Sequence, residues 1–600
     1  MLPLSPNAQR VLEARYLLRD AGGRALEDFQ GLCDRVAGAV AGAEREFGAD
    51  EQATAEAFAG ALARREFLPN SPTLMNAGTP IGQLAACFVL PVEDSLESIF
   101  ESVKRMAVIH QSGGGTGFSF SRLRRAGDPV QGNPGVASGP VSFLQVFDAA
   151  TAVIVQGGRR RGANMGVLRV DHPDVFEFVR AKARPDRITN FNLSVATTDA
   201  FWRAAINRES FDLVNPRDGK VVGSVDAGGL LDEIAEHAWA GGDPGMIFLD
   251  AVNRENPTPR SGALEATNPC GELPLLPNES CNLASLRLDA FVDGAAERSS
   301  KALERIEWER LDGAIDLAVR FLDDVIETSD FPYPEIREVT LANRKIGLGV
   351  MGFADLLVDL GLAYDSPEAV AVADRLMAHI RSRAERASAL LAEERGVFPN
   401  FRGSRVEARG LRLRNATVTS IAPTGTLSIL ADCSGGIEPY FALAFVRHVL
   451  DGERMPETNP RLESALRRAG AWSPDLLAEI QGTGSVRGVA SVPGSIRRLF
   501  PTASDIAAEC HLDIQEAFQR RVDNAVSKTI NLPESATPAE IRRIYTAAWR
   551  RGLKGVTVFR EGCKSGALER GRWVPPGPDS RSPGGIALGG RASRPFDPDG

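Results

Sequence analysis

Residues 268–281 (NPCGELPLLPNESC) carry the side chains best suited to chemistry. Asn268, Cys270 and Glu272 are spaced two apart, so in an extended segment their amide, thiol and carboxylate point to one side. The proline and glycine between them disfavour a central strand, because proline lacks a donor and glycine weakens the ladder. We therefore expect an extended loop that offers three reactive groups to one small volume. A buried small side chain at Cys270 beside a solvated Glu272 is the alternative, and spacing alone leaves both open.

Two glycine-rich turns match nucleotide-binding loops only in part. Residues 110–118 (HQSGGGTGF) let the backbone approach a ligand, but they lack the Lys-Ser/Thr ending of a P-loop. Residues 347–352 (GLGVMG) fit the dinucleotide-binding fingerprint by letters, yet they follow Asn343-Arg-Lys and not a clear strand. Close packing of a helix against its neighbours is the favoured explanation for these last glycines.

Three further segments are suited to binding phosphate. Residues 422–429 (APTGTLSI) follow a β-branched run and lead into an apolar helix, whose free N–H groups would form an anion site. A plain N-cap by Thr424 or Thr426 is the alternative. Residues 70–78 (NSPTLMNAG) offer further hydroxyls, and residues 156–166 form a cationic loop that suits a phosphate-bearing ligand or is simply a solvated charge run.

Composition excludes several classes of protein. The 600 residues are 43% hydrophobic and 24% charged, with a net charge of −9, which gives no basic footprint for nucleic acid. There is no signal-peptide pattern and no apolar run long enough to span a membrane. The seven cysteines show no C-x-x-C spacing, which argues against a disulfide framework or a structural metal site. A cytoplasmic chain with reduced thiols is predicted.

The order of elements predicts an α/β fold. Residues 1–70 are expected to be helical, with an N-cap at Ser5 and two Ala- and Glu-rich segments at 34–47 and 51–66. Residues 71–565 alternate strand-like runs with amphipathic helices, for example at 416–430 and 536–558, without a linker that would divide them. Residues 566–600 are rich in Gly and Pro and poor in large apolar side chains, so a disordered tail is predicted.

Several motifs together resemble the ribonucleotide reductases. They are NPCGE at 268–272, ESCNL at 279–283, ACFVLPVEDS at 86–95, NSPTLMNAG at 70–78, GGRRRGANMG at 157–166, APTGT at 422–426 and VDNAVSKTINLP at 522–533. Within that family, the sequence from about residue 5 to residue 565 is similar to the vitamin B12-dependent (class II) enzymes. The resemblance implies a ten-stranded α/β barrel with the Cys270 loop threading its centre.

The resemblance also implies a reaction in which the 2′-hydroxyl of a ribonucleotide is replaced by hydrogen. Adenosylcobalamin would supply the radical that turns Cys270 into a thiyl. Glu272 would act as the general base on the 3′-hydroxyl, and Asn268 would orient the ribose. Cys87 and Cys281 would deliver two electrons as they close to a disulfide.

The same resemblance assigns binding positions. Those implied for substrate are Ser71, Ala86, Cys87, Gly115, Asn268, Pro269, Cys270, Gly271, Glu272, Pro423, Thr424, Gly425, Thr426 and Leu427. Asp94, Ser95, Leu96 and Arg124 match positions that hold a dNTP or ATP effector between paired subunits, although a helix N-cap also explains Asp94-Ser95. Residues 157–166 match the loop that relays effector identity. A homodimer is expected, and diphosphate substrates are favoured over triphosphates.

Missing motifs narrow the class. The C-terminal region at 555–561 (GVTVFRE) has no tyrosine pair of the class I large subunit, and no glycyl-radical motif occurs. No Asp-x-His-x-x-Gly signature occurs either, so cobalamin binding is implied by the resemblance alone. A non-catalytic nucleotide-binding regulator, a class I-type large subunit and a glycyl-radical-like lyase are the alternatives.

The remaining cysteines have no catalytic role in this interpretation. Cys33, Cys433 and Cys510 are expected to be core thiols, and Cys563 is unassigned. Residues 569–600 contain no cysteine. Re-reduction of Cys87–Cys281 is therefore expected to need a thioredoxin-like reductant or a separate protein that carries a cysteine pair. With dithiothreitol the chain should turn over many times, whereas with thioredoxin alone it should stall after about one turnover.

Overall fold

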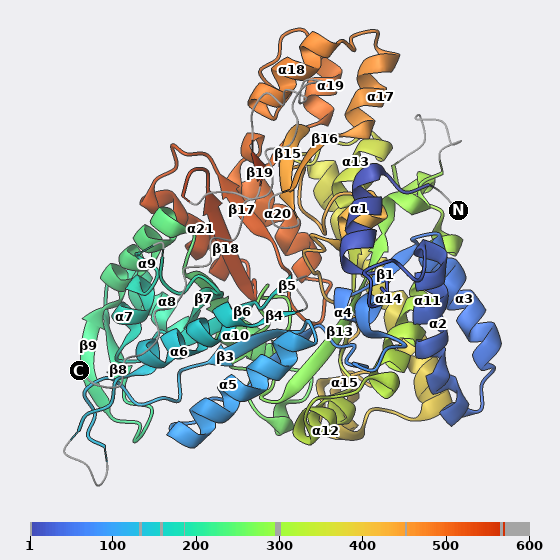
Figure 1. Ribbon diagram of the computed structural model, residues 1–600. Helices are drawn as coiled ribbons and strands as arrows, with labels where there is room; N and C mark the ends of the chain where they lie inside the picture. The colour runs from blue at the N-terminus through green and yellow to red at the C-terminus, as the bar shows by residue number, and fades with distance from the viewer. Residues whose placement is uncertain are drawn as a thin grey trace, which may run out of the picture.

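An N-terminal layer of helices packs against one side of a barrel (Figure 1). The computed structural model describes residues 3–130, 135–156, 160–184, 186–293, 302–449, 453–563 and 568–569. The layer consists of α1 (Pro6–Arg15), α2 (Phe29–Ala41), η1 (Gly42–Phe47) and α3 (Glu51–Ala63). Ser5 caps α1 by accepting the Ala8 N–H, with Pro6 at the first helical position, as the sequence predicts.

Ten strands form one mixed sheet. One half is parallel throughout, in the order β2 (Cys87–Leu90), β3 (Gly115–Ser119), β6 (Asn164–Arg169), β7 (Phe191–Thr197) and β10 (Gly245–Phe248). The other half contains β13 (Glu279–Arg287), β14 (Ile346–Met351), β17 (Thr529–Leu532) and β18 (Gly555–Arg560), with β1 (Phe67–Pro69) beside β13. The halves meet in antiparallel pairs, β13 with β2 and β18 with β10.

Two isolated parallel bridges close this sheet into a barrel. Leu348 of β14 pairs with Thr419, and Ile421 pairs with Val526 just before β17. The β-branched run at 417–421 therefore occupies a strand position, although its pairing is limited to these bridges. The predicted α/β barrel is confirmed.

Helices cover the outside of both halves (Figure 1). Around the parallel half lie α5 (Leu96–Gln111), α6 (Pro140–Val153), α7 (Val175–Arg180), α8 (Asp199–Asn207), α9 (Ala227–Gly241) and α21 (Pro538–Arg550). Around the other half lie α11 (Trp308–Thr328), α13 (Phe353–Leu360), α14 (Pro367–Arg395) and α20 (Ala508–Gln519). Because both faces of the strands are covered, β2 and β3 are buried at every residue and do not alternate.

The interior of the barrel holds a hairpin. Its strands are β11 (Ala266–Thr267) and β12 (Pro274–Leu275), and its apolar side chains belong to a small core with Cys87, Cys281 and the inner faces of β2, β6 and β10. The expectation that the Cys270 segment lies inside the barrel therefore agrees with the structure.

A smaller subdomain stands at one end, at the top of Figure 1. It contains β15 (Ala444–Val449), β16 (Glu453–Thr458), α17 (Pro460–Arg468), α18 (Pro474–Thr483) and α19 (Gly494–Leu499). Arg461 at the start of α17 joins it to the barrel through ion pairs with Asp289 at 3.0 Å, Asp355 at 3.1 Å and Asp359 at 2.8 Å.

Short elements complete the described chain. They are α4 (Ser71–Asn76), β4 (Val155–Gln156), β5 (Arg160–Arg161), β8 (Ser210–Val214), β9 (Val221–Asp226), α10 (Leu249–Arg254), η2 (Pro259–Ser261), η3 (Leu288–Phe291), η4 (Ala302–Arg305), α12 (Pro334–Asn343), η5 (Pro399–Phe401), α15 (Arg405–Ala408), α16 (Leu427–Ala431), η6 (Ala503–Asp505) and β19 (Leu568–Glu569). Among the described residues, no helix has the length and apolar character needed to cross a membrane.

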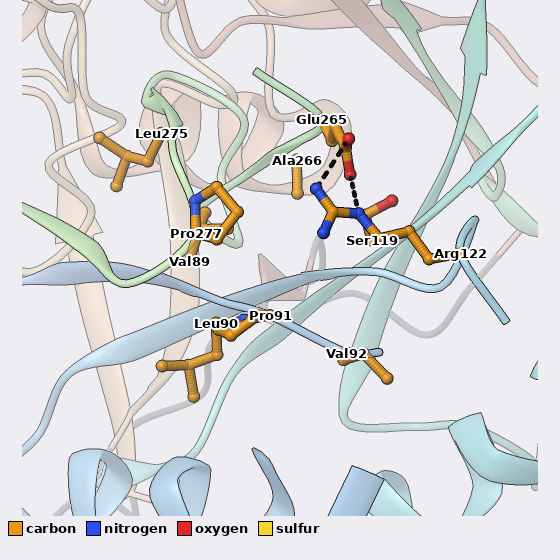
Figure 2. A pocket seen from close by; sticks show the side chains of 10 residues that line it. All are labelled: Val89, Leu90, Pro91, Val92, Ser119, Arg122, Glu265, Ala266, Leu275 and Pro277. Atoms are coloured by element: carbon orange, nitrogen blue, oxygen red, sulfur yellow. Dashed lines mark hydrogen bonds and ion pairs between the residues drawn. The ribbon is translucent and has the colours of Figure 1, made fainter. Parts of the chain in front are cut away.

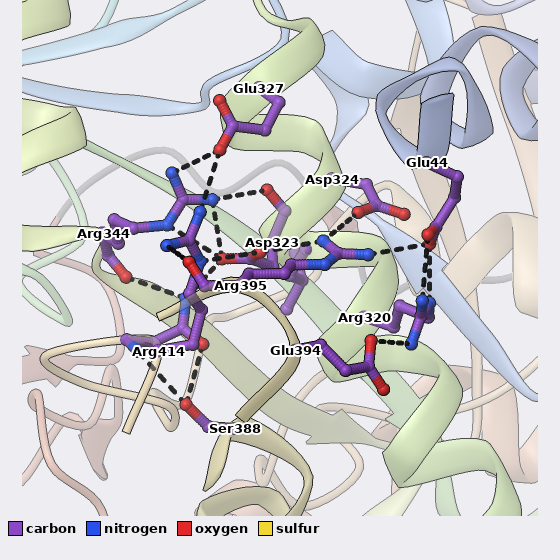
Figure 3. A network of polar contacts seen from close by, with 12 residues as sticks. Glu44, Arg320, Asp323, Asp324, Glu327, Arg344, Ser388, Glu394, Arg395 and Arg414 are labelled. Carbon is purple, nitrogen blue, oxygen red and sulfur yellow. Dashed lines mark hydrogen bonds and ion pairs between the residues drawn. The ribbon is translucent and has the colours of Figure 1, made fainter. Parts of the chain in front are cut away.

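A buried ion network joins the N-terminal layer to the barrel helices (Figure 3). Arg395 of α14 has no exposed side-chain surface and contacts Glu44 at 2.9 Å, Asp323 at 3.0 Å and Asp324 at 2.6 Å. Arg320 reaches the same Glu44 carboxylate at 2.6 Å. Since Glu44 belongs to η1 and the other four residues belong to α11 and α14, these charges fasten the two layers together.

One expectation about glycine was wrong in its detail. Residues 347–352 were expected to ease helix packing, but Gly347 and Gly349 lie on strand β14. A Cβ on Gly349 would come within 2.2 Å of the Ser420 carbonyl oxygen, and one on Gly347 within 2.9 Å of the Ser420 Cβ. These glycines allow two neighbouring barrel segments to approach closely.

Candidate active site

The tip of the interior hairpin is a tight turn. The Asn268 N–H donates to the Leu273 carbonyl at 3.2 Å, and the Gly271 N–H donates to the Asn268 carbonyl at 3.1 Å. Gly271 has a φ of +83°, which a residue with a side chain rarely adopts. The expectation of an extended segment with three side chains on one side was therefore wrong, because the chain reverses within it. Asn268 and Glu272 are buried on the two arms, and Cys270 stands exposed at the tip.

Missing side chains on β3 let the hairpin approach the parallel half of the barrel. A Cβ on Gly117 would lie 1.8 Å from the Thr267 carbonyl oxygen, and a Cβ on Gly115 would lie 2.9 Å from the Pro269 ring. The Asn192 amide on β7 donates to the Pro269 carbonyl at 2.9 Å. Residues 110–118 were expected to let the backbone approach a ligand closely. At Gly115 it is the protein's own hairpin that makes this close approach.

The opposite half of the barrel holds the other arm. The Glu272 carbonyl accepts hydrogen bonds from the Ser420 hydroxyl at 2.9 Å and from the Ala525 N–H at 2.8 Å. Both donors lie on the segments that close the barrel. The hairpin is therefore fixed from two sides, which positions its tip for chemistry.

Cys87 and Cys281 face each other across two strands. They are register partners in the antiparallel pairing of β2 with β13, and both are buried as thiols. Directly opposed residues in such a ladder have Cα atoms about 4.5–5.5 Å apart, which falls within the range that a disulfide spans. Strand register thus brings together two cysteines that are distant in sequence.

Asn268 connects the hairpin to this pair. Its side-chain amide N–H donates to the Cys87 sulfur at 3.1 Å, and its side-chain oxygen Oδ1 accepts the Leu273 N–H at 3.0 Å. Burial, followed by the charges that Glu272, Cys270 and Cys281 would carry, raises the pKa of the Cys87 thiol. The three cysteines and the carboxyl group therefore converge around one point.

Glu272 is prepared for proton transfer at neutral pH. Its side chain is 2% exposed, and burial raises its pKa from 4.5 to about 7, against the smaller lowering effect of Asn268. Its Oε2 atom has no hydrogen-bond partner among the described residues. A buried carboxyl oxygen without a partner is suited to accept a proton from a bound molecule.

The expected phosphate-binding segments meet at the end of α1. The Tyr16 hydroxyl lies 2.9 Å from the Ser71 hydroxyl, and the Arg15 guanidinium donates to the Thr426 hydroxyl at 3.0 Å. The Arg15 Nε atom is buried and has no partner in the described part of the chain. Three hydroxyls and a cation thus gather at the end of α1, where the sequence indicated the hydroxyls of Ser71 and Thr426 but not Arg15.

The loop before α16 has an unusual backbone. Thr424 has a φ of +52°, and its hydroxyl accepts the Gly436 N–H at 2.8 Å. Thr426 occupies the N-cap position of α16 without a side-chain cap bond, so capping does not explain its hydroxyl. Around the two threonines, Pro423 precedes the strained residue, a Cβ on Gly425 would meet open space, and Leu427 begins the helix.

Backbone bonds link Ala86 to Cys281 and to Gly115. Ala86 donates to the Cys281 carbonyl at 3.3 Å and accepts from the Gly115 N–H at 2.8 Å. Ser420, which holds the hairpin, lies two residues before the loop. The expected positions at 86–87, 115 and 268–272 therefore lie around the hairpin, and Ser71 and Thr426 lie at the end of α1.

The expected effector residues form a separate group. The Arg124 guanidinium bonds to the Asp94 carboxylate at 2.8 Å, and Ser95 caps α5 through the Ser98 N–H at 3.1 Å. Leu96 is 59% exposed. This group follows the end of β2 opposite to Cys87, so the structure does not bring it to the catalytic residues.

A small pocket lies at that same end of the barrel (Figure 2). It is lined by Val89, Leu90, Pro91, Val92, Ser119, Arg122, Glu265, Ala266, Leu275 and Pro277. Arg122 closes its rim by bonding to Glu265 at 3.0 and 3.1 Å. The pocket borders the base of the hairpin and contains none of the expected catalytic residues.

The four other cysteines differ in burial. Cys33 is buried as expected, whereas Cys433 and Cys510 are only partly buried and Cys563 is also partly exposed. Residues 157–159 of the cationic loop and residues 566–567 and 570–600 of the expected tail lie outside the described residues, whereas Leu568–Glu569 of that tail form β19, which pairs with β15.

Sequence reasoning missed several residues of the site. Asn192, Ser420 and Ala525 act through contacts between distant segments, which no local pattern reveals. Arg15 had a weak signal, since it ends a capped helix within the span of the resemblance. Lys345 lies one residue before β14 and beside Cys281, and only the strand register shows this.

Two family models match the chain. The all-alpha domain of ribonucleotide reductase matches residues 2–82, and the barrel domain of ribonucleotide reductase matches residues 85–411 and 404–559. Together they cover the N-terminal helices and the barrel described above.

Curated relatives and a solved structure agree with these models. The chain is 52% identical to the vitamin B12-dependent ribonucleoside-diphosphate reductase of Mycobacterium tuberculosis (strain CDC 1551 / Oshkosh), over 94% of this chain and 81% of that protein. It is 44% identical to the protein of that name from Thermoplasma acidophilum, over 94% and 80%. The class Id ribonucleotide reductase alpha subunit of Actinobacillus ureae superposes with a TM-score of 0.74 at 22% identity, over 93% of this chain and 97% of that chain, and so shares the fold. Because the models span both layers and close relatives cover most of the chain, the protein belongs to the ribonucleotide reductase family.

Proposed function

We propose that this protein reduces ribonucleoside diphosphates to 2′-deoxyribonucleotides by thiyl-radical chemistry that depends on adenosylcobalamin. One observation carries the proposal: a hairpin inside the barrel presents Cys270 at its tip, with Asn268 bonded to Cys87 and Cys87 in register with Cys281. The curated relatives at 44% and 52% identity are named vitamin B12-dependent ribonucleoside-diphosphate reductases. Among the five tyrosines, no two are adjacent, which disfavours the class I alternative.

The cofactor fits the accessibility of the thiols. Cys270 is exposed, whereas Cys87 and Cys281 are buried, so of these three thiols Cys270 is the one that a bulky group can reach from outside. When bound, adenosylcobalamin supplies an organic radical. Cys270 is the residue that would face it and give up the hydrogen atom of its thiol.

Four other residues have separate roles in proton transfer, electron transfer and positioning. Glu272 accepts the proton of the substrate 3′-hydroxyl, which its unpartnered Oε2 and its pKa near 7 support. Cys87 and Cys281 together supply two hydrogens and are left as a disulfide, while the 2′-hydroxyl leaves as water. Asn268 keeps Cys87 and the ribose in register through its bond to the Cys87 sulfur.

Phosphate binding is assigned to the loop at 422–427, to Ser71 and to Arg15. The guanidinium of Arg15 bonds to Thr426 and keeps one buried N–H without a partner, so it can donate to a phosphate oxygen. A cation in this position neutralises part of the diphosphate charge.

Regulation is proposed at the start of α5. Asp94, Ser95, Leu96 and Arg124 would bind a dNTP or ATP effector in a homodimer. The helix presents the side chains of Leu96 and Phe100, which are 59% and 53% exposed, on one face. We also propose a cytoplasmic setting and a thioredoxin-like reductant or cysteine-pair shuttle protein, which would keep the thiols reduced.

Anaerobic turnover of CDP tests the function. Wild type with dithiothreitol should form dCDP only when adenosylcobalamin is added. Cys270→Ser should bind CDP normally and form no product, because a serine O–H bond is too strong for the radical to open. Product formation without the cofactor, or by Cys270→Ser, would contradict the proposal.

A further inference from the structure

Cys281 lies next to a buried ion pair whose position the proposed reaction does not yet explain. The Lys345 ammonium contacts the Glu279 carboxylate at 2.7 Å, and the two side chains are 1% and 0% exposed. Taking two charges out of water is expensive, and a well-packed apolar pair of similar volume is often as stable. The barrel wall therefore gains little stability from this pair, which points to a functional role for its charges.

Strand geometry places both charged residues beside Cys281. Glu279 and Cys281 are two residues apart on β13 and share its inner face. Ile346 is the register partner of Asn282, so Lys345 sits beside Cys281 on the other flank of the strand. The Cys281 sulfur lies 3.4 Å from the Lys345 carbonyl oxygen.

The two members of the pair are not equally satisfied. The Glu279 carboxylate also accepts from the Asn343 amide at 2.6 Å and from the Leu276 N–H at 2.7 Å. Within the described chain, the Lys345 ammonium bonds to Glu279 alone, which uses one of its three N–H groups. Three donors therefore spread the negative charge, and the ammonium keeps capacity for another anion.

Cys87 has no such cation among its close neighbours in the described chain. It faces the Glu272 carboxyl and the Asn268 amide, and it is 6% exposed against 1% for Cys281. Burial raises the pKa of Cys281, Lys345 is the strongest influence that lowers it, and Glu279 and Glu272 have smaller raising effects. Of the two sulfurs, Cys281 is therefore the one with a cation beside it, and Cys87 is the one with the larger exposed fraction.

We propose that Lys345, held by Glu279, is a positioning residue that makes Cys281 the leaving thiolate when the Cys87–Cys281 disulfide is reduced. This inference rests on the proposed function, which supplies the disulfide. A thiolate of a dithiol reductant attacks the Cys87 sulfur; the internal S–S bond breaks, and its electron pair leaves on Cys281 beside Lys345. The second reductant thiolate then displaces Cys87 and forms the reductant's own disulfide. The two protons lost by the reductant thiols end on Cys87 and Cys281.

Trapping the first step tests the proposal. The protein is oxidised with diamide, opened with the monothiol 2-mercaptoethanol, quenched in acid, denatured, alkylated and mapped by mass spectrometry. In wild type the mercaptoethanol adduct should lie on Cys87 and the alkyl group on Cys281. Lys345→Met should open about tenfold more slowly and lose this preference, because a developing charge on Cys281 is no longer compensated. Lys345→Arg should restore both.

Control variants distinguish the effect of the Lys345 charge from an effect on folding. Lys182→Met removes a lysine from the Asp243 ion pair elsewhere in the barrel and should leave rate and adduct position unchanged. Glu279→Gln/Lys345→Met removes both charges without stranding the carboxylate and should behave like Lys345→Met. If none of the variants at Lys345 folds, the position of the mercaptoethanol adduct in wild type alone tests the inference.

Three results have distinct meanings. An adduct mainly on Cys281 in wild type would overturn the inference. Wild-type rate and preference in folded Lys345→Met would overturn it as well. If diamide forms no Cys87–Cys281 disulfide at all, the redox pair of the proposed function is wrong, and the inference falls with it.

Discussion

Replacing Glu272 with glutamine should make the protein more stable at alkaline pH while it abolishes activity. Burial raises the pKa of Glu272 from 4.5 to about 7, so the folded protein must pay to keep this group ionised. Glutamine has nearly the same shape and carries no charge at any pH. The variant therefore removes a cost that exists only when the carboxylate is ionised.

The sign and size follow from the two pKa values. Between 4.5 and about 7 the folded state binds this proton and the unfolded state does not. The stability contributed by the protonated form is fully present below 4.5 and is lost as the pH rises through 7. With about 1.4 kcal/mol for each pKa unit, the unfolding free energy of Glu272→Gln relative to wild type should rise by about 2.5 kcal/mol between pH 5 and pH 8.

Urea unfolding at pH 5 and pH 8 measures this difference. Glu393→Gln is the matched control, because it makes the same chemical change at an exposed position on α14. Infrared spectra give a second reading: the carboxylic-acid C=O band that wild type has and Glu272→Gln lacks should titrate near pH 7. A stability difference that is the same at both pH values, with no such band, would refute the reasoning.

The same group sets a prediction for catalysis. As the general base, Glu272 must be ionised, so kcat/KM for CDP should rise with pH through about 7 and level off above it. An activity that is flat from pH 5.5 to pH 8 would remove Glu272 from this role.

Four other changes have defined outcomes. Cys87→Ser and Cys281→Ser should each still bind CDP but release free base instead of deoxynucleotide, and peptide mapping of wild type after one turnover without reductant should find these two residues joined; a different pairing would contradict the assignment. Arg15→Met should raise KM for CDP about tenfold with little change in kcat, by loss of a charge-assisted bond to phosphate; an unchanged KM would exclude that contact. Arg395→Met should lower the unfolding free energy by about 3–5 kcal/mol, because it removes the cation shared by three buried carboxyl groups and leaves Asp324 without one; a loss below 1 kcal/mol in urea would show that the network is dispensable.

Local signals were enough for much of the fold. The cap at Ser5, the helix at 538–550 and the strand that follows it at 555–560 are where their residue patterns indicate. These elements depend on capping, periodicity and β-branched content, which act over a few residues. The run at 417–421 was harder, since its strand position depends on single bridges to distant segments.

The site was predictable in its residues but not in its geometry. The spacing of Asn268, Cys270 and Glu272 indicated convergence, yet the chain turns at Gly271 and does not stay extended. Strand register, which a sequence does not display, brings Cys87 opposite Cys281 and Lys345 beside it. Residue types could therefore be chosen from motifs, whereas their partners required the assembled barrel.

The charges shared between η1 and α14 bear on how such a protein can be divided. Family models separate an all-alpha domain from a barrel domain, which suggests two modules that could be cloned apart. Expressing residues from 85 onward would remove Glu44. Arg395 and Arg320 would then lose one carboxylate partner each and keep only their other acidic neighbours. The truncation would also remove Arg15 from the proposed phosphate site. The boundary between the two family models is thus not a boundary between independent folding units, and a shortened chain should keep both parts.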